Sequence, residues 1–247
     1  NGFIGYHLLN TLNTKDKFQV LDFDRSYFQN NNLIDQFITN SDVVVHLAGV
    51  NRDKSEMKIF ETNIDLAKKI AESIERTNFS GKLIYISSTQ EDNNSSYGRS
   101  KKESREILST LCDKLSVDFS SLIVPNVFGP FCKPNYNSFI ATFCNSIITK
   151  KTPKIIENNN VKLVYINNLI NQIIFEFTSV SSIRVIDYDV EIKVESVLEK
   201  LNSFNETYLK KGNIPNISNR FELNLFNTFR SYINLKSFFP QEHKINK

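Results

Sequence analysis

Short runs of apolar, largely β-branched residues alternate with helix-length amphipathic segments in the first half of this 247-residue chain. The predicted strands cover residues 18–21, 43–47, 83–86 and 122–124. Between them, the segments 59–76 and 97–111 carry apolar residues at helical spacing. Near-continuous apolar strands connected through helices are typical of a parallel sheet that is covered on both faces. The pattern therefore predicts a doubly wound α/β fold.

The pattern changes after Gly129 and Pro130, where a loop rich in Pro and Asn begins. Further on we expect strands at 161–166 and 183–186, and helices at 138–148, 169–177, 194–201 and 221–232. We interpret the Asn-rich patches 30–32 and 158–160 as surface turns. The chain is then expected to have two parts, one made of 1–130 with about 163–187, and a smaller, mostly helical one made of 131–162 with 188–247.

Composition and charge exclude several classes of function. The net charge of +3 comes from basic residues spread along the chain, which does not favour nucleic acid as a partner. No apolar run approaches the roughly 20 residues of a membrane span, and no secretion signal is visible, so a cytoplasmic protein without a membrane partner is expected. Cys112, Cys132 and Cys144 match no zinc spacing, so we expect reduced cysteines and no metal.

The chain starts with Asn1 and Gly2 rather than Met and continues directly into an apolar, helix-like segment. Gly2 and Gly5 are spaced as in a phosphate-binding turn, where backbone amides at a helix N-terminus approach a pyrophosphate. A role of these glycines in packing alone is the alternative. We expect that the strand before this turn, the first of the sheet, is missing from this chain.

Tyr97 and Lys101 are four residues apart in a predicted helix, so the phenol and the ammonium face the same way. A nearby positive charge lowers the pKa of a phenol, which would allow Tyr97 to exchange a proton near neutral pH. Lys101 could also hold a ribose hydroxyl. The alternative is that both residues lie on the helix surface without a chemical role.

Hydroxyl residues end the buried strand that precedes this helix. In open α/β sheets ligands bind at the carboxyl ends of the strands, which would present Ser88 where Tyr97 points. A hydroxyl at this place could polarise a carbonyl group by hydrogen bonding to its oxygen. The alternative is that Ser87, Ser88 and Thr89 form a capping and turn cluster.

These motifs together resemble the extended short-chain dehydrogenase/reductases, the NAD-dependent epimerase/dehydratase family. The resemblance rests on segments spread in order over the first 130 residues, namely 2–5, 42–49, Asn63, Ser87 with Ser88, Tyr97 with Lys101, and 125–130. It implies a Rossmann-like parallel sheet and a smaller substrate-binding lobe.

A narrower resemblance lies in residues 50–52, 88–90 and 134–144. These segments are similar to those of bacterial capsular-polysaccharide enzymes that reduce a UDP-4-keto-6-deoxy-N-acetylhexosamine on the route to UDP-N-acetyl-L-fucosamine. Such enzymes carry a C-terminal cupin domain, which we expect to be absent because the chain stops at Lys247.

The family resemblance implies a role for each matching residue. The implied catalytic residues are Ser88, Tyr97 and Lys101, with Thr89 in place of Ser88 if the strand register is shifted by one. The implied cofactor-binding residues are Gly2, Phe3, Ile4, Gly5, Asp24, Arg25, Leu47, Ala48, Gly49, Asn63, Tyr97 and Lys101. The implied substrate-binding residues are Asn126, Lys133, Asn135, Tyr136 and Ser138, although the loop 133–138 could also be a plain solvent-facing turn.

The choice of cofactor depends on the end of the second predicted strand. An acidic residue there accepts hydrogen bonds from the ribose hydroxyls of NAD, whereas an arginine binds the extra phosphate of NADP. Both Asp24 and Arg25 are present. The position of Arg25 favours NADPH, and Asp24 keeps NAD open. The chain also departs from the family in having Ile123 and Val124 where an arginine is usual, and amides at 167–168 where an acidic pair is usual.

The expected activity is NADPH-dependent reduction of the 4-keto group of a UDP-linked 6-deoxy-N-acetylhexosamine by a homo-oligomer in capsule polysaccharide biosynthesis. One alternative is an epimerase or dehydratase with bound NAD, which would need a further acid and base. Glu91 and Asp92 are candidates for these groups. The other alternative is a truncated scaffold that binds a nucleotide without catalysis.

Overall fold

The computed structural model describes residues 2–234, and the chain folds as two compact units. Unit 1 comprises Asn1–Val127 and Ile166–Tyr188, and unit 2 comprises Phe128–Tyr165 and Asp189–Lys247. The assignment of cofactor binding to unit 1 and of substrate binding to unit 2 remains a proposal.

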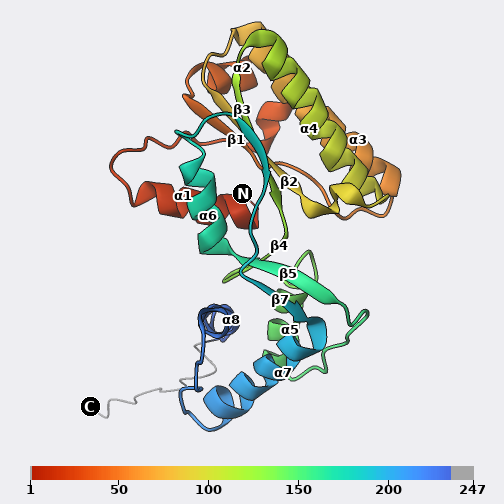
Figure 1. Ribbon diagram of the computed structural model, residues 1–247, viewed down its shortest axis with the longest axis vertical. Coiled ribbons are helices and arrows are strands. Elements are labelled where there is room, and N and C mark those ends of the chain that lie inside the picture. Colours follow the sequence, from red (N-terminus) through yellow and green to blue (C-terminus); the bar gives the residue numbers. More distant parts are fainter. Residues whose placement is uncertain (1, 235–247) are drawn as a thin grey trace, which may run out of the picture. The chain divides into compact units, whose positions relative to one another are not determined.

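The sheet of unit 1 has four strands in the order β1-β2-β3-β6, and all neighbouring pairs are parallel (Figure 1). The strands are β1 (Val43–His46), β2 (Lys82–Ser88), β3 (Asp118–Val124) and β6 (Ser182–Val185). This confirms the predicted parallel α/β fold. In the register of the sheet, His46 at the end of β1 lies opposite Tyr85 of β2. Ser88 at the end of β2 lies opposite Val124 at the end of β3. Because the strands are parallel, their carboxyl ends lie at the same edge of the sheet.

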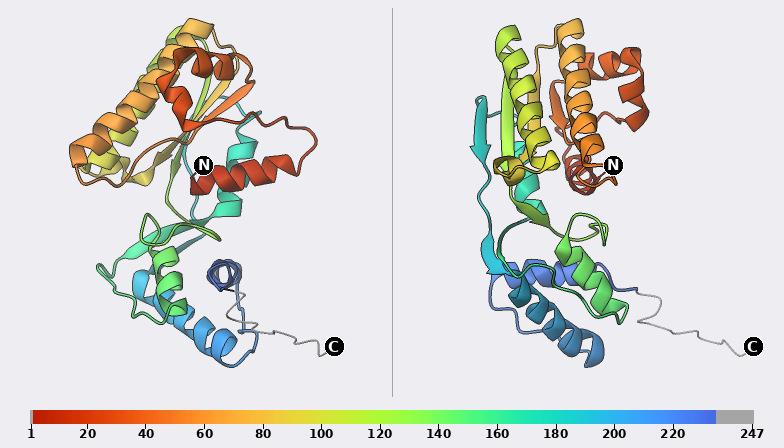
Figure 2. Two further views of the ribbon diagram at one scale, coloured as in Figure 1. Left: turned by 180° about the vertical axis from the view of Figure 1, so that it is seen from behind. Right: turned by 90° about the vertical axis from the view of Figure 1, so that its right-hand side faces the viewer.

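Helices of unit 1 form two groups. The first contains α2 (Asn31–Thr39), α3 (Glu56–Thr77) and α4 (Ser96–Leu115), which pack side by side (Figure 2). The second contains α1 (Phe3–Asn13) and α6 (Ile166–Phe175), which also contact each other. Leu83 and Tyr85 of β2 share one core cluster with the first group. Because side chains alternate along a strand, Ile84 and Ile86 point to the opposite face of the sheet, where both are buried.

Serine caps fix where the two long helices begin. The Ser55 hydroxyl accepts a hydrogen bond from the Lys58 amide, and the Ser95 hydroxyl accepts one from the Gly98 amide. Each helix is followed by a left-handed residue, Asn78 after α3 and Ser116 after α4. Such a residue allows the last carbonyl groups of a helix to be satisfied by a tight turn. The ends of α4 are therefore defined locally.

Two predictions in unit 1 are wrong. Residues 18–21 do not form a strand, because among the described residues they have no neighbouring strand with which to pair. An apolar, β-branched run favours extended backbone but does not supply a hydrogen-bonding partner. The patch 30–32 is also not a surface turn, since Asn30 caps α2 through bonds from the amides of Asn32 and Leu33. The side chain of Asn30 thus starts a helix that the sequence pattern did not reveal.

Unit 2 is built around a small sheet in the order β4-β5-β7. Its strands are β4 (Asn126–Phe128), which begins in unit 1, β5 (Asn160–Tyr165) and β7 (Val190–Lys193), and β5 and β7 are antiparallel. The helices are α5 (Phe139–Ile148), α7 (Val194–Phe204) with a π-helical extension at Asn205–Lys210, and α8 (Arg220–Arg230). Of the patch 158–160, Asn160 begins β5 and Asn158 bonds to the Glu195 amide.

Within the part of the chain that the structure describes, no helix is both long and apolar enough to cross a membrane. The same part contains no group of three or more His, Cys, Asp or Glu residues placed to hold a metal ion. Cys112, Cys132 and Cys144 are free thiols, and all three are buried.

Candidate active site

The start of α4 is packed directly against the end of β2. Gly98 makes this possible, because a Cβ atom at this position would collide with the backbone oxygen of Gln90. Gln90 belongs to η2 (Thr89–Asp92), a short 3-10 turn that follows β2 without a gap. The sequence interpretation did not assign a role to Gly98, although a glycine next to Tyr97 was a signal for close approach.

Tyr97 and Lys101 lie one helical turn apart at this end of α4. Tyr97 is half-buried, and Lys101 is buried with 5% of its surface exposed. The Lys101 Nζ atom lies 4.2 Å from the centroid of the Tyr85 ring. Burial raises the pKa of Tyr85, and the charge of an ionised Tyr97 would raise it further. Lys101 therefore contacts a buried residue of β2.

The electrostatics around Lys101 are set by burial. Burial lowers the pKa of Lys101 to about 7, while the nearby Glu91 carboxylate acts in the opposite direction. Burial and the charge of Lys101 lower the pKa of His46 to about 3, so this imidazole is neutral at pH 7. Lys101 can thus lose or regain a proton near neutral pH, which is useful for a group beside a proton donor.

The hydroxyl residues at the end of β2 have different surroundings. Ser87 is buried and donates to Glu91, so it points away from the solvent-facing end of the strand. Ser88 is half-buried, and its Oγ accepts a hydrogen bond of 3.2 Å from the Gln90 amide. Thr89 is half-buried and begins η2. The capping interpretation therefore holds for Ser88 in this structure, and both Ser88 and Thr89 remain candidates for the carbonyl-binding hydroxyl.

A buried ion pair that the sequence interpretation missed supports this end of the sheet. The Arg105 Nε atom lies 3.1 Å from both carboxylate oxygens of Glu91, and a second guanidinium nitrogen lies 2.7 Å from Oε2. Only 5% of the Glu91 side chain is exposed. Arg105 follows Lys101 by four residues, which was a signal that it shares the same face of α4. The pair anchors η2 to α4.

The glycine motif lies beside the end of β1. Gly2 precedes the first turn of α1, which contains Phe3, Ile4 and Gly5, and no side chain of residues 2–234 caps this helix. A Cβ atom on Gly5 would lie 3.7 Å from Leu47 Cδ1. The uncapped amides of α1 are therefore close to the segment 47–49, which includes Ala48 and Gly49. Uncapped helix N-termini attract anions such as a pyrophosphate.

Asn63 connects three parts of the candidate site. Its Oδ1 atom accepts a hydrogen bond from the Val50 amide at 2.7 Å, and its amide group donates to the Val50 carbonyl at 2.8 Å. It also donates to Ser100 Oγ at 2.9 Å. Both N–H groups of the amide are used within the protein, and the side chain is buried. Asn63 thus holds the loop after β1 against α4.

Asp24 and Arg25 lie on the surface at the start of a 3-10 turn, η1 (Arg25–Gln29). The Asp24 Oδ1 atom accepts hydrogen bonds from the Ser26 amide at 2.8 Å and from its hydroxyl at 2.6 Å. These bonds lower the pKa of Asp24. Arg25 is exposed, which leaves its guanidinium accessible to a phosphate.

The predicted substrate residues are divided between the units. Asn126 is exposed and belongs to unit 1, whereas the loop 133–138 belongs to unit 2. In this loop Lys133 and Tyr136 are exposed, with Nζ 5.7 Å from the ring centroid. Asn135 is also exposed and has a left-handed backbone. Ser138 is buried and caps α5 by accepting a bond from the Ala141 amide, so its hydroxyl has a structural role.

Fold and site together define a parallel α/β protein with a Tyr–Lys pair on the helix that follows the central strand β2. Residues 1–185 match the model of the NAD dependent epimerase/dehydratase family. The chain belongs to this family, which confirms the resemblance predicted from the sequence.

Two similar proteins agree with the narrower resemblance. The chain is 29% identical over 244 residues to the UDP-2-acetamido-2,6-beta-L-arabino-hexul-4-ose reductase of Pseudomonas aeruginosa, covering 96% of this chain and 64% of that protein. It superimposes on the capsular polysaccharide assembling protein CapF of Staphylococcus aureus with a TM-score of 0.81 and 23% identity, over 96% of this chain and 64% of that one. This chain therefore spans less than two thirds of the length of these relatives.

A further solved structure has a similar fold along almost its whole length. The protein RMD of Pseudomonas aeruginosa, solved in complex with NADPH, superimposes with a TM-score of 0.79 at 14% identity. The match covers 94% of this chain and 96% of that one.

Proposed function

We propose that this chain uses NADPH to reduce the 4-keto group of a UDP-linked 6-deoxy-N-acetylhexosamine in surface polysaccharide biosynthesis. The main support is the placement of the buried Lys101 one helical turn from Tyr97, next to the carboxyl end of β2. The Pseudomonas relative is named as a reductase of a UDP-linked 4-ketosugar, and the Staphylococcus relative as a capsular polysaccharide protein. The first name gives the substrate class of the proposal, and the second gives the biosynthetic process.

The residues present fit a dinucleotide. An uncapped helix N-terminus at Gly2 and the small residues Ala48 and Gly49 leave backbone accessible for a pyrophosphate. Lys101 would hold the nicotinamide ribose through its ammonium group. Bound NADPH would supply a hydride to the ketone carbon.

The protein's own groups would then handle the oxygen and the proton. A hydroxyl of Ser88 would donate a hydrogen bond to the ketone oxygen and stabilise the negative charge that develops there. Tyr97 would transfer its phenolic proton to this oxygen, which yields the alcohol. The ammonium form of Lys101 would stabilise the resulting phenolate. Because its pKa is near 7, Lys101 is in equilibrium between its charged and neutral forms at physiological pH.

NADPH is favoured over NADH by the state of the two residues at 24 and 25. One carboxylate oxygen of Asp24 is occupied by Ser26, whereas the Arg25 guanidinium is exposed. Arginine binds the additional phosphate of NADPH in a bidentate manner. The NADPH bound by the Pseudomonas protein RMD agrees with this choice.

The epimerase or dehydratase alternative has less support. Such chemistry would require a carboxylate beside the hydroxyl residues at the end of β2. Glu91 is the buried candidate, but its carboxylate is held by Arg105 and Ser87. A carboxylate fixed in this way is poorly placed to exchange a proton with a substrate.

In unit 2, we assign the sugar nucleotide to the exposed loop that contains Lys133, Asn135 and Tyr136. The Lys133 ammonium can pair with a phosphate, and the Tyr136 ring can stack on a base or a sugar. Asn126, which is exposed in unit 1, is proposed by itself as a further substrate-binding residue. These assignments rest on the residue types and their exposure.

Replacement of Tyr97 by Phe tests the proposal. We expect Tyr97→Phe to lower the turnover of a UDP-4-keto-6-deoxy-N-acetylhexosamine with NADPH by at least about 100-fold, because the proton donor is lost. The Kd for NADPH, measured by fluorescence titration, should change by less than about threefold. The control is Tyr136→Phe, which should raise KM and leave kcat nearly unchanged. Substantial turnover by Tyr97→Phe would refute the assignment, and a folded wild-type chain that binds no NADPH would favour an inert scaffold.

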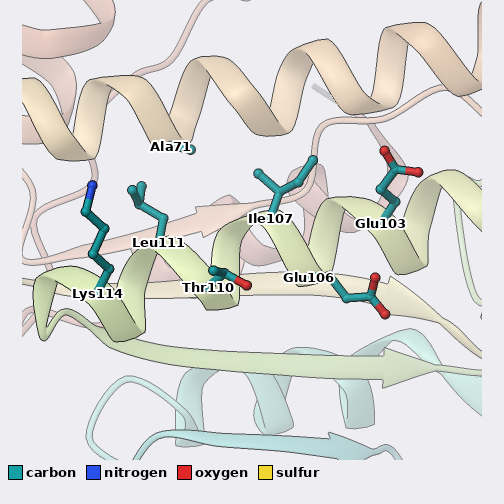
Figure 3. A pocket seen from close by; sticks show the side chains of 7 residues that line it. All are labelled: Ala71, Glu103, Glu106, Ile107, Thr110, Leu111 and Lys114. Carbon is teal, nitrogen blue, oxygen red and sulfur yellow. The ribbon is translucent and has the colours of Figure 1, made fainter.

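We also propose that the chain forms a homodimer through the outer surface of α3 and α4. Figure 3 shows a groove there in which Ile107 and Leu111 lie between Glu103 and Glu106 at one end and Lys114 at the other. In an antiparallel pair of α4 helices, Lys114 of one copy would face the two glutamates of the second copy. We expect Ile107→Glu to convert a dimer into a monomer in sedimentation velocity. A wild-type monomer at micromolar concentration would contradict this proposal.

A further inference from the structure

Tyr85 contacts Lys101 at two points. The residue lies in β2 and is almost completely buried, with 1% of its surface exposed. Its hydroxyl donates a hydrogen bond of 3.3 Å to the Lys101 carbonyl, and its ring face lies 4.2 Å from the Lys101 Nζ atom. The backbone and the ammonium group of the same lysine are therefore both in contact with one side chain.

Strand β1 contributes a second contact to Tyr85. His46 lies opposite Tyr85 in the parallel register, and the two rings stack with a centroid distance of 5.6 Å and an interplanar angle of 23°. His46 is itself buried. The imidazole restricts the Tyr85 ring to one orientation, so the ring cannot rotate away from Lys101 without losing this stack.

The Tyr85 ring is in direct contact with the ammonium group of Lys101. Burial of an ammonium is costly unless another group compensates for the lost water. No ion pair of Lys101 is found among residues 2–234, and Glu91, which acts on Lys101 through space, is bound by Arg105. The negative face of an aromatic ring stabilises a cation at this distance, most strongly where water is excluded.

We propose that Tyr85 is a positioning residue that holds the Lys101 ammonium at the end of β2. This inference deepens the proposed function, on which it rests. Besides Tyr85, the titratable groups that interact with Lys101 are His46 from β1 and Glu91 from η2. Tyr97 and Arg105 of α4 act on Tyr85. The Tyr85 ring contacts the charged group of Lys101, so it affects both the position of Nζ and the fraction of Lys101 that carries a proton.

The test is a direct titration of Lys101 in the full chain without cofactor. The Cε signal of lysine labelled with carbon-13 reports protonation by NMR, and Lys101→Arg identifies the signal. Tyr85→Phe keeps the ring and should move the pKa by less than about 0.3 units. Pentafluorophenylalanine at position 85 keeps the shape but removes the negative ring face, and should lower the pKa by about 0.5 to 1.5 units relative to Tyr85→Phe. Since both side chains fill the same space, neither should open a cavity.

Ile84→Val is the matched control, because Ile84 lies next to Tyr85 in β2 but is buried on the opposite face. This variant should leave the Lys101 titration unchanged. Equal pKa values for Lys101 with phenylalanine and pentafluorophenylalanine at position 85 would overturn the proposal. This outcome is separate from failure of the proposed function, because the titration requires neither substrate nor turnover. A chain with the expected titration but without reductase activity would retain Tyr85 as the partner of Lys101 and refute the reaction.

Discussion

At the scale of single residues, the proposed reaction needs one of the two hydroxyls at the end of β2 to bind the ketone oxygen. Ser88 accepts a hydrogen bond from the Gln90 amide, so its own proton is still available for donation to a ligand. Thr89 lies one residue further and begins η2. The position of the two side chains relative to Tyr97 decides which hydroxyl is used, and the order of residues alone does not.

Substitution separates the two hydroxyls. We expect Ser88→Ala to lower kcat by about 10²- to 10³-fold, because an oxyanion donor is lost. It should also lower the free energy of unfolding by about 1 kcal/mol, because η2 loses its cap. Thr89→Val keeps the shape of its side chain and should lower kcat by less than about fivefold. The reverse order of effects in steady-state kinetics would assign the donor role to Thr89.

At the scale of elements, α3 and α4 are fixed relative to the loop after β1 by Asn63. The side chain bonds to both backbone groups of Val50 and to Ser100, and the Ser104 hydroxyl donates to the Asn63 carbonyl. Ser100 in turn donates to the Tyr97 carbonyl. A change in the loop after β1 would therefore reach the helix that carries Tyr97 through the hydrogen bonds of Asn63 and Ser100.

Removal of the Asn63 side-chain amide should lower the stability of the chain and weaken NADPH binding at the same time. We expect Asn63→Ala to lower the free energy of unfolding by about 2–4 kcal/mol, because the two Val50 backbone groups lose their partner. The Kd for NADPH should rise at the same time. Urea denaturation and fluorescence titration measure the two effects. The exposed Asn10→Ala is the control, and its effect should stay within about 0.5 kcal/mol. An unchanged unfolding midpoint for Asn63→Ala would show that these bonds do not hold the loop.

The elements also show what the sequence could predict. Strands β2 and β3 were found because continuous apolar runs are sufficient to identify buried parallel strands. The segment 18–21 is also mostly apolar, but it is interrupted by Gln19 and has no pairing partner in the described structure. The placement of Tyr97 and Lys101 one turn apart could be predicted because both lie on a single helix. The contacts of Tyr85 with Lys101 and of Glu91 with Arg105 join different elements, and local patterns do not encode such contacts.

At the scale of the whole molecule, buried ionisable groups make stability depend on pH. The pKa of His46 is lowered to about 3 by burial, so between pH 6.5 and 3 the unfolded chain binds more protons than the folded one. Folding stability must fall as the pH is lowered through this range. The pKa of Lys101 is lowered to about 7, so by the same argument stability rises between pH 7 and 10.5.

Urea denaturation as a function of pH checks these signs. We expect the free energy of unfolding to fall by several kcal/mol between pH 7 and 4, with a smaller fall in His46→Gln, whose side chain does not titrate. Lys101→Met should remove the rise in stability between pH 7 and 10. Acidic groups such as Asp35, whose pKa is lowered by hydrogen bonds from Arg76, add to the loss only at lower pH. Identical pH profiles for wild type and His46→Gln would contradict this explanation.

The transfer of hydride to the sugar is the central claim, and isotope labelling measures it most directly. The chain is incubated with a UDP-4-keto-6-deoxy-N-acetylhexosamine and NADPH that carries deuterium at the transferred position of the nicotinamide. We predict a sugar product that is one mass unit heavier than the product formed with unlabelled NADPH, with deuterium on C4 in the NMR spectrum. No labelled product from the wild-type chain, under conditions where it is folded and binds NADPH, would contradict the account.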